Sequence, residues 1–264
     1  MAASPGVDDP RVVEAFRTVP REPFVGPGPW LILEDGGYVP SASADPALIY
    51  EDVVIALAPD KRINNGQPSL HARCLSAARV RAGEKVLHIG CGTGYYSAIL
   101  AELVGPSGVV SAWDVEPSLA KAAQRNLRPW ANSSVSLSSG IEAPIPDSDV
   151  IYVCAGCTQP ARSWAQALSN GGRLLFPLTP GWGFGGMLMI TREGGEYRAT
   201  FVCKCSFIPS VGGSNPAAEE ALRNAFAAQS MECVSGFHFG DVAERRKVWF
   251  EGDGWWLSTS SMCQ

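Results

Sequence analysis

The sequence of 264 residues lacks long hydrophobic runs and any excess of basic side chains, and it contains only three histidines. No stretch approaches the ~18 consecutive apolar residues that a membrane-spanning helix requires, so we expect no membrane contact. The 21 basic side chains are outnumbered by 26 acidic ones, so the chain lacks the excess of positive charge typical of nucleic-acid-binding proteins. The first ten residues have neither the basic nor the apolar region typical of a signal peptide, so we expect a cytoplasmic protein.

Hydrophobic residues make up 46% of the chain and charged residues only 18%, a composition that excludes intrinsic disorder. The length fits one large domain, or a core domain with an appendage, and it can bury a substantial core. Eight cysteines are scattered along the chain, at 74, 91, 154, 157, 203, 205, 233 and 263. Their spacing is not that of a small disulfide scaffold, so we expect reduced and mostly buried thiols.

Cys154 and Cys157 form a C-x-x-C pair, which is compatible with half a zinc site or with a redox couple. A zinc site needs two further ligands, and the later cysteines and His238 lack a matching spacing. We therefore favour structural cysteines and expect no metal site.

Strands and helices alternate between Gln67 and Gly140 in a pattern typical of a parallel sheet with helices on both faces. The expected elements are a helix at 68–78, a strand at 85–89, a helix at 95–104, a strand at 108–113 and a helix at 117–127. Further along, we expect strands at 150–154 and 172–177, a helix at 161–168 between them, and an antiparallel pair at 187–191 and 197–207.

The two ends of the chain carry weaker patterns. Segment 9–24 predicts an amphipathic helix capped by Asp9, and Asn215 is expected to cap a helix at 216–228. Residues 26–47 are rich in Pro, Gly, Ser and Asp, which predicts a long loop. The tail at 236–258 alternates aromatic and polar residues and predicts one or two strands.

Five aromatic side chains have two interpretations. Trp182 and Phe184 lie in a glycine-rich loop and are read as core residues or as part of a lid. Trp249, Trp255 and Trp256 cluster in the tail, where alternating aromatics are usually core or dimer contacts.

Gly90, Gly92 and Gly94 form a G-x-G-x-G turn between an expected strand and an expected helix. Glycine lets the backbone turn sharply and approach a ligand closely, and the following helix offers free N–H groups. Residue 95 is Tyr, so the turn departs from the dinucleotide pattern G-x-G-x-x-G. Asp114 ends the next strand, where a carboxylate can accept hydrogen bonds from ribose hydroxyls. The combination predicts a nucleoside site; the alternative is a tight turn with a helix-capping Asp.

Six stretches of sequence resemble one family. They are VPREPFV at 19–25, YED at 50–52, QP at 67–68, VLHIGCGTGY at 86–95, GGRL at 171–174 and FIP at 207–209. In this order they resemble the protein-L-isoaspartate O-methyltransferase family of class I S-adenosylmethionine-dependent methyltransferases. The resemblance implies a Rossmann-like α/β fold with a mostly parallel seven-stranded sheet, N-terminal helices and a C-terminal extension.

The resemblance also implies S-adenosyl-L-methionine as the cofactor, lying over the turn at 90–94. The implied cofactor-binding residues are His88, Gly90, Cys91, Gly92, Gly94, Tyr95, Asp114, Val115, Gly140, Ile141 and Glu142. We accordingly expect an N-terminal helical and loop region at 1–66 that forms part of the acceptor site and a cofactor-binding core at 67–211. A C-terminal extension at 212–264 follows and is a candidate for a homodimer contact.

The chain departs from the family pattern at three places. Gly66 stands where the family has a serine before the Gln-Pro pair, and His88 stands where it usually has an acidic residue. The family's Gly-Asp-Gly reads Gly140-Ile141-Glu142 here. The residues expected to act as catalytic or acceptor-orienting groups in place of the serine are Asn64, Asn65, Gln67, Ser69 and His71.

These features predict an enzyme that converts a free carboxylate to a methyl ester, with a small carboxylic acid or a specific peptide carboxylate as the acceptor. A carboxylate is already ionised at neutral pH, so the protein would contribute orientation and desolvation rather than a strong base. The alternatives are isoaspartyl repair and a catalytically silent, cofactor-binding interaction module. His71 is read equally as an acceptor contact or a plain helix residue, whereas for His88 a structural role is favoured.

Overall fold

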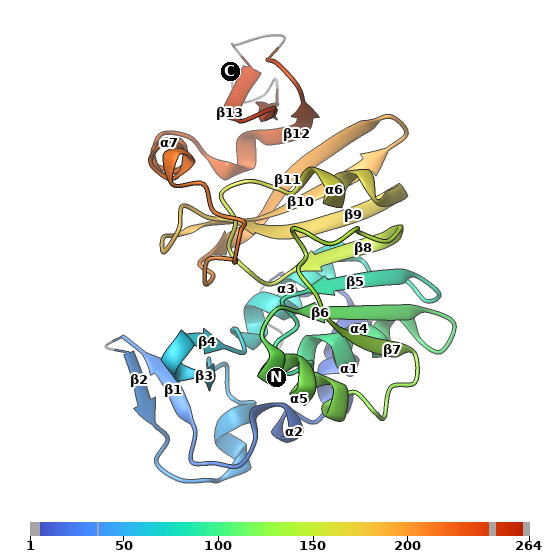
Figure 1. The fold of residues 1–264 in the computed structure, drawn as a ribbon, viewed down its shortest axis with the longest axis vertical. Helices are drawn as coiled ribbons and strands as arrows, with labels where there is room; N and C mark the ends of the chain where they lie inside the picture. Colours follow the sequence, from blue (N-terminus) through green and yellow to red (C-terminus); the bar gives the residue numbers. More distant parts are fainter. Residues whose placement is uncertain (1–5, 36, 243–246, 261–264) are drawn as a thin grey trace. The chain divides into compact units, whose positions relative to one another are not determined.

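The computed structural model describes residues 6–35, 37–242 and 247–260 (Figure 1). The chain divides into two compact units that meet in sequence between Gly140 and Ile141. The three-region division at 66 and 211 that the sequence suggests remains a prediction.

The first unit combines N-terminal helices and short hairpins with a parallel sheet. Its helices and strands are α1 (Pro10–Thr18), α2 (Glu22–Val25), β1 (Leu31–Glu34), β2 (Gly37–Pro40), η1 (Pro46–Tyr50), β3 (Ala56–Ala58), η2 (Pro59–Lys61), β4 (Ile63–Asn64), α3 (Pro68–Ala78), β5 (Lys85–Ile89), α4 (Tyr95–Val104), β6 (Val109–Asp114), α5 (Pro117–Asn126) and β7 (Ser133–Leu137).

The predicted N-terminal helix is confirmed over Pro10–Thr18 as α1, and the rest of the predicted segment continues into the separate short helix α2. The Asp9 carboxylate accepts a hydrogen bond from the Arg11 backbone N–H at 2.9 Å, and Pro10 occupies the first turn. Val12 and Phe16 are buried on the face of α1 that packs against α3 and α4. The burial of this apolar stripe is what holds a short helix that would be marginal alone.

The prediction of a long loop at 26–47 is wrong. Strands β1 and β2 form an antiparallel hairpin in which Leu31 pairs with Pro40 and Glu34 with Gly37. The hairpin is held from outside its own sequence, because the Leu33 N–H donates to the Val54 carbonyl at 2.9 Å. The Pro and Gly content predicts turns, but it does not predict pairing with residues remote in sequence. Composition alone therefore favours a loop.

Strands β5, β6 and β7 form the parallel sheet expected from the alternation of strands and helices. Lys85 is in register with Val109, and Val110 with Ser133. Helix α4 connects β5 to β6 and packs on both, and α5 connects β6 to β7 in the same way. Strand β7 is not predicted from the sequence, because its serine-rich sequence SSVSL has low strand propensity.

The second unit is built on a mixed sheet. Its elements are β8 (Ser148–Val153), α6 (Arg162–Gln166), β9 (Leu168–Leu178), β10 (Gly185–Glu193), β11 (Glu196–Cys205), α7 (Pro216–Ala228), η3 (Met231–Cys233), β12 (Val234–Phe239), β13 (Val248–Gly252) and β14 (Trp255–Thr259). Their order in the sheet is β8-β9-β10-β11-β12-β14-β13, with β8 and β9 parallel and the remaining neighbours antiparallel. The α/β class is confirmed, and the seven-strand count is not.

The antiparallel pair β10–β11 and the Asn215 cap of α7 are both confirmed. Met187 pairs with Cys203 and Glu193 with Glu196, so the turn falls on Gly194 and Gly195 as expected. The Asn215 side chain accepts a hydrogen bond from the Ala217 N–H at 3.0 Å.

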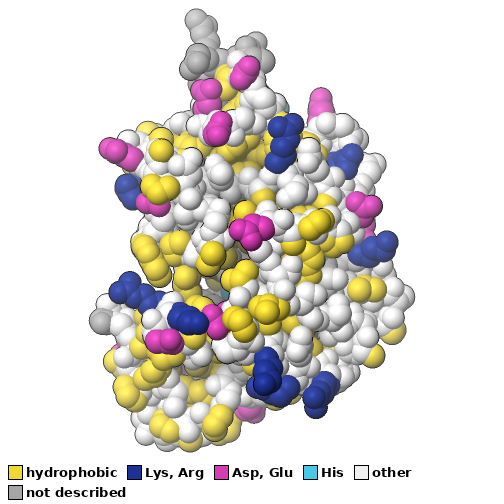
Figure 2. Space-filling model, in the orientation of Figure 1, with side chains coloured by type: hydrophobic (Ala, Val, Ile, Leu, Met, Phe, Trp, Pro, Cys, Tyr) yellow, Lys and Arg dark blue, Asp and Glu magenta, His cyan; other side chains and the backbone are white. Residues whose placement is uncertain are grey.

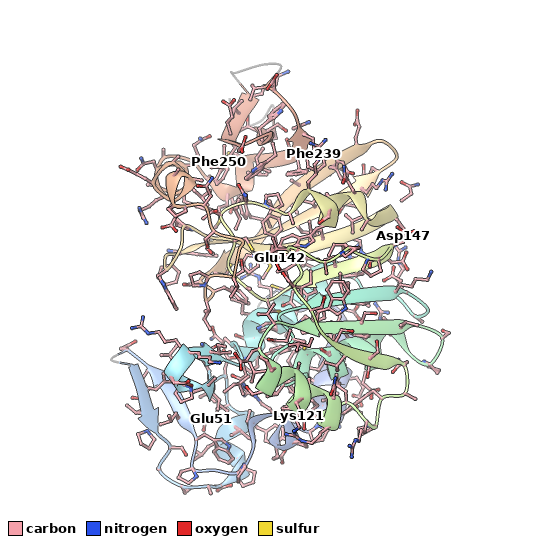
Figure 3. All side chains as sticks on the ribbon, in the orientation of Figure 1. Glu51, Lys121, Glu142, Asp147, Phe239 and Phe250 are labelled. Carbon is pink, nitrogen blue, oxygen red and sulfur yellow. The ribbon has the colours of Figure 1, made fainter. Side chains whose placement is uncertain are left out.

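The tail forms three strands in place of the one or two predicted. Trp249, Trp255 and Trp256 are buried there, which confirms the core interpretation for these side chains. Phe239 on β12 and Phe250 on β13 belong to the same aromatic region (Figure 3). Trp182 and Phe184 are 64% and 67% exposed, so they are not core residues, and the lid remains a prediction.

Cys74, Cys91, Cys154, Cys157, Cys203 and Cys205 are free thiols, as expected. Cys74, Cys91, Cys157 and Cys205 are buried thiols, and burial raises the pKa of Cys157 to about 11. A protonated thiol is a poor metal ligand and nucleophile, which argues against redox chemistry at the C-x-x-C pair. Cys233 is disulfide-bonded, so the expectation of a reduced thiol is wrong there, and Cys263 lies outside the described residues.

The helices and the distribution of potential metal ligands bear on partners and metals. None of the helices in 6–35, 37–242 and 247–260 has both the length and the apolar character needed to cross a bilayer. Within these ranges, no three His, Cys, Asp or Glu residues gather as metal ligands would. On the face drawn in Figure 2, Lys and Arg side chains are interspersed with Asp and Glu.

Candidate cofactor and acceptor site

The glycine turn after β5 adopts a backbone that only glycine enters freely. The φ angles of Gly90, Gly92 and Gly94 are +75°, +56° and +97°. The N–H groups of Gly90 and Cys91 both donate to the Trp113 carbonyl, at 2.8 and 3.0 Å, so the turn is tied to the end of β6. Helix α4 begins directly afterwards at Tyr95, and its first N–H groups have no acceptor within the helix.

Asp114 lies at the end of β6 and faces this turn. Its Oδ2 accepts a hydrogen bond from the Gly92 N–H at 2.7 Å, and its Oδ1 accepts one from the Glu116 N–H at 2.9 Å. Burial raises the pKa of this carboxyl above its ordinary value, and the two backbone N–H groups offset part of that rise. Each oxygen retains a further lone pair, so the oriented carboxylate can still accept from ribose hydroxyls.

Apolar side chains stand beside Asp114. Val115 follows it directly and is 47% exposed, and Leu137 is in register with Asp114 and is 58% exposed. If Asp114 binds the ribose as predicted, exposed aliphatic groups beside it are placed to contact the faces of a purine. Sequence reasoning included Val115 and missed Leu137, whose only signal is its position at the end of a strand with little strand character.

The predicted cofactor-binding residues Gly140, Ile141 and Glu142 lie where the two units meet in sequence. A Cβ atom on Gly140 would stand 2.4 Å from the Ile89 Cγ2, so packing against β5 requires glycine there. Ile141 and Glu142 belong to the second unit, and Glu142 is labelled in Figure 3. Their role toward the cofactor remains a prediction.

His88 is fully buried in β5, and its Nδ1 lies 2.7 Å from the Ser97 Oγ of α4. Burial lowers its pKa to about 3, so the ring is neutral near pH 7. This contact joins β5 to α4 behind the glycine turn, which supports the structural interpretation. Its predicted contact with the cofactor has no further observation behind it.

Asn64 and Asn65 are fixed by different neighbours. The Asn64 Nδ2 donates to the Tyr38 hydroxyl at 3.0 Å, and its Oδ1 accepts from the Gly66 N–H at 2.9 Å. The Asn65 Oδ1 accepts from the Ile55 N–H at 2.8 Å. Tyr38 comes from the β1–β2 hairpin, so sequence reasoning, which read a loop there, missed it.

Gln67 and Ser69 share one carboxylate partner, Asp52. The Gln67 Nε2 donates to Asp52 at 2.7 Å, and the Ser69 backbone N–H and Oγ donate to it at 2.8 and 2.6 Å. Asp52 therefore serves the first turn of α3 in the way that a capping carboxylate does. The donors predicted for an acceptor at these two residues are engaged with Asp52 in this structure.

His71 is 2% exposed and stacks on Tyr96, with ring centroids 3.6 Å apart and planes 13° from parallel. Burial holds its pKa well below the usual value, and nearby Arg21 acts in the same direction. A Cβ atom on Gly66 would lie 2.2 Å from the His71 Nε2. The imidazole thus fills the space that a side chain at position 66 would need.

Arg21, in the VPRE stretch, organises the segment that precedes the acceptor residues. Its buried guanidinium donates to the carbonyls of Ile49 at 2.5 Å, Glu51 at 3.2 Å and Val53 at 2.8 Å. Glu51 is labelled on this segment in Figure 3. The guanidinium carbon also lies 5.8 Å from the centre of the Tyr95 ring. Arg21 joins the segment at 49–53 to the start of α4, a role that sequence reasoning did not assign.

The β3–β4 hairpin lies against the glycine turn. A Cβ atom on Gly92 would meet the Leu57 Cδ1 at 3.3 Å, and the Lys61 Nζ lies 2.5 Å from the Glu116 Oε2. Glu116 is two residues beyond Asp114. The predicted cofactor turn and the predicted acceptor segment are therefore close in this unit.

These features fit a bound S-adenosyl nucleoside. The turn at 90–94 would allow close backbone approach, the oriented carboxylate of Asp114 would accept from the ribose, and Val115 with Leu137 would contact the base. When bound, S-adenosyl-L-methionine supplies an electrophilic methyl group on a sulfonium sulfur.

Solved structures with the same fold define the class of protein. One protein-L-isoaspartate O-methyltransferase superposes with a TM-score of 0.66 at 20% identity, covering 97% of this chain and 85% of its own. The Plasmodium falciparum β-aspartate methyltransferase (PCMT), solved with S-adenosyl-L-homocysteine, gives 0.61 at 16% identity over 77% of this chain and 91% of its own. The fold is therefore that of the class I S-adenosylmethionine-dependent methyltransferases.

Sequence comparison narrows the class to a family. The sequence model for protein-L-isoaspartate(D-aspartate) O-methyltransferase (PCMT) matches residues 3–215. The protein-L-isoaspartate O-methyltransferase of Protochlamydia amoebophila is 31% identical over 215 residues, 80% of this chain and 92% of that protein. The Brucella anthropi protein of the same name is 30% identical over 78% and 88%. The chain belongs to the PCMT family of carboxyl methyltransferases, and its cofactor is S-adenosyl-L-methionine.

Proposed function

We propose that this protein methylates a peptide carboxylate, and that the carboxylate of an isoaspartyl residue is its acceptor. The observation that carries the proposal is the family match over residues 3–215, which includes both the cofactor turn and the segment at 64–71. Relatives that share about 30% identity over most of their length bear the name protein-L-isoaspartate O-methyltransferase.

Methylation of a carboxylate requires no proton transfer to a side chain of the protein. An acceptor carboxylate is ionised at neutral pH, so no general base has to be supplied. The imidazole nearest Gly66 is neutral, because burial keeps the pKa of His71 well below its ordinary value. What remains for the chain is to orient one carboxylate oxygen toward the methyl group and to exclude water around it.

The family pattern has serine where this chain has Gly66, so the acceptor is to be identified by experiment. The protein should be incubated with methyl-labelled S-adenosyl-L-methionine and an isoaspartyl peptide, with the matched aspartyl peptide as control. We expect label on the isoaspartyl peptide alone, and its loss in mild base, since methyl esters hydrolyse there whereas ethers and N-methyl groups persist.

A panel of small carboxylic acids belongs in the same experiment. Label on a small acid and none on the isoaspartyl peptide would replace the peptide acceptor with a small-molecule acceptor. Cofactor binding by calorimetry without methyl transfer to any carboxylate would identify a cofactor-binding module and refute the proposed activity.

A further inference from the structure

The Asn65 carboxamide is buried, 8% exposed, and its orientation is fixed. Its Oδ1 accepts the Ile55 N–H at 2.8 Å, while its own backbone N–H donates to the Ile55 carbonyl at 3.0 Å. The Ile55 N–H can only donate, so the oxygen of the amide must face it and the nitrogen must point elsewhere.

The Asn65 Nδ2, which points away from Ile55, has no acceptor among the described residues. The Asn65 Nδ2 is a buried donor without a hydrogen-bond partner among the residues that the structure describes. Buried donors in native proteins are nearly always paired, with protein, water or ligand, because leaving one unpaired costs the full desolvation of the group. An acceptor from outside the chain is therefore expected at this atom.

Asn65 lies beside the predicted methyl-transfer site. The carbonyl of the next residue, Gly66, accepts a hydrogen bond from the Tyr96 hydroxyl at 3.3 Å. Tyr96 belongs to the first turn of α4, directly after the glycine turn. The polar segment at 64–66 is thus attached to the helix whose N-terminus faces the cofactor.

The neighbouring side chains are blocked by another residue or already form hydrogen bonds. A side chain on Gly66 is barred by the His71 imidazole, 2.2 Å from where its Cβ would be. The side-chain donors of Asn64, Gln67 and Ser69 are directed to Tyr38 and Asp52. Among these positions, the Asn65 Nδ2 is the one buried nitrogen that has no hydrogen-bond partner within the described residues.

We propose that Asn65 is the specificity-determining residue for the methyl acceptor: its Nδ2 donates to one oxygen of the acceptor carboxylate and leaves the other oxygen for methylation. This inference rests on the proposed function. A hydrogen bond to a charged carboxylate is stronger than one to the neutral ester, so the same donor binds substrate more tightly than product.

The test is Asn65→Asp, which keeps the oxygen that receives the Ile55 N–H but replaces the donor with a second acceptor. Binding of an isoaspartyl peptide should be measured by calorimetry with S-adenosyl-L-homocysteine present, so that the readout does not depend on turnover. We expect peptide affinity to fall by at least about tenfold, as for loss of a charge-assisted hydrogen bond, with affinity for S-adenosyl-L-homocysteine changed less than about twofold.

The matched control is Asn132→Asp, in the same unit. The Asn132 Nδ2 donates to the Ala101 and Gly105 carbonyls, at 3.0 and 2.8 Å, so this carboxamide is structural. It should lower the melting temperature and leave peptide affinity unchanged. If Asn65→Asp behaves as Asn132→Asp does, the Asn65 donor is structural and the inference is overturned.

Turnover separates the inference from the function on which it rests. If the wild-type protein binds the peptide but transfers no methyl group, the proposed function fails while the binding comparison still decides the role of Asn65. If no carboxylate ligand binds the wild-type protein, both are refuted. In an active protein, Asn65→Asp should raise the acceptor KM.

Discussion

Asp114 is buried in the predicted cofactor site, and the N–H groups of Gly92 and Glu116 orient its carboxyl group. Replacing it with Asn keeps its shape but removes the charge, so the hydrogen bonds to the ribose lose their charge-assisted character. We expect Asp114→Asn to weaken S-adenosyl-L-methionine binding by roughly 1.5–3 kcal/mol, which is about 10- to 150-fold in Kd by calorimetry.

The pH dependence of the same binding gives an independent check. Burial raises the pKa of Asp114, so acidification should protonate it, and weaken cofactor binding, at a higher pH than an ordinary aspartate would require. The Asp114→Asn protein should lack this decline. Asp60→Asn, an exposed position on η2, is the control and should match wild type. Equal pH dependence in wild type and Asp114→Asn would place the ribose elsewhere.

Gly66 and His71 behave as a pair in this structure. A serine introduced at 66 alone would overlap the His71 Nε2 and would also occupy a left-handed backbone, with φ at +68°. We expect Gly66→Ser to be destabilising, and Gly66→Ser with His71→Ala to be less destabilised than the sum of the single changes. A double-mutant cycle on urea unfolding measures the coupling, about 0.5–3 kcal/mol for residues in contact.

Additive effects in that cycle would contradict the contact. The overlap would be relieved in the double variant, but the backbone strain at 66 would remain. The double variant therefore should not recover full stability, and Gly66→Ala with His71→Ala should show the same coupling, because the clash begins at the Cβ atom.

At the scale of elements, Arg21 holds together parts of the chain that have little regular structure. The segment at 49–53 includes the end of η1 and no strand, and its carbonyls are bound by one buried guanidinium. Buried carbonyls that lose their donor pay a desolvation penalty. Asp52 lies in this segment and binds Ser69 of α3, so disorder there should also affect the start of that helix.

We expect Arg21→Met to lower the free energy of unfolding by about 3 kcal/mol, since it removes hydrogen bonds from a charged donor to buried acceptors. Urea denaturation measures the change. The control is Arg17→Met on α1, where the arginine is exposed and pairs with Glu14 across the helix surface. That change should lie within about 0.5 kcal/mol of wild type. A similar small effect for Arg21 would show that the segment at 49–53 is held by other contacts.

At the scale of the whole molecule, the two buried imidazoles make stability depend on pH. Burial lowers the pKa of His88 to about 3 and that of His71 well below its ordinary value. The unfolded chain takes up protons on both below about pH 6.5, whereas the folded chain does not. The unfolded state then binds more protons, so stability is full above this pH and falls as the pH is lowered toward 3.

We expect each imidazole to contribute a slope of up to about 1.4 kcal/mol per pH unit between pH 6 and 4. His88→Gln should reduce the slope by one such contribution, measured by urea unfolding across this range. Carboxyl groups titrate in the same window, so the informative quantity is the difference between the two proteins. An unchanged slope would mean that His88 takes up a proton in the folded state.

The C-terminal extension is part of the second unit rather than an appendage to it. Strand β12 pairs with β11, and the Trp249 ring lies 5.3 Å from Phe201 of β11 and 5.1 Å from Phe226 of α7. Aromatic contacts of this kind bury large apolar areas. The homodimer contact expected for the extension remains a prediction. Its tryptophans are buried within one chain, where they pack as core residues.

The sequence alone determined the features that depend on neighbours along the chain. The glycine turn at 90–94, Asp114 and the helices at 68–78, 95–104 and 216–228 were predicted because glycine conformation, capping and apolar periodicity are local properties. The family followed from motifs in order, and so did the cofactor.

Tertiary structure decided what depends on residues remote in sequence. The β1–β2 hairpin, β7 and the three strands of the tail are defined by pairing with other strands, which composition and local periodicity do not record. The hydrogen bonds of Arg21, the exclusion of a side chain at 66 by His71 and the orphan nitrogen of Asn65 arise only when distant segments pack. Burial sets the free energy of a polar group, and burial is a property of the folded chain, not of its sequence neighbours.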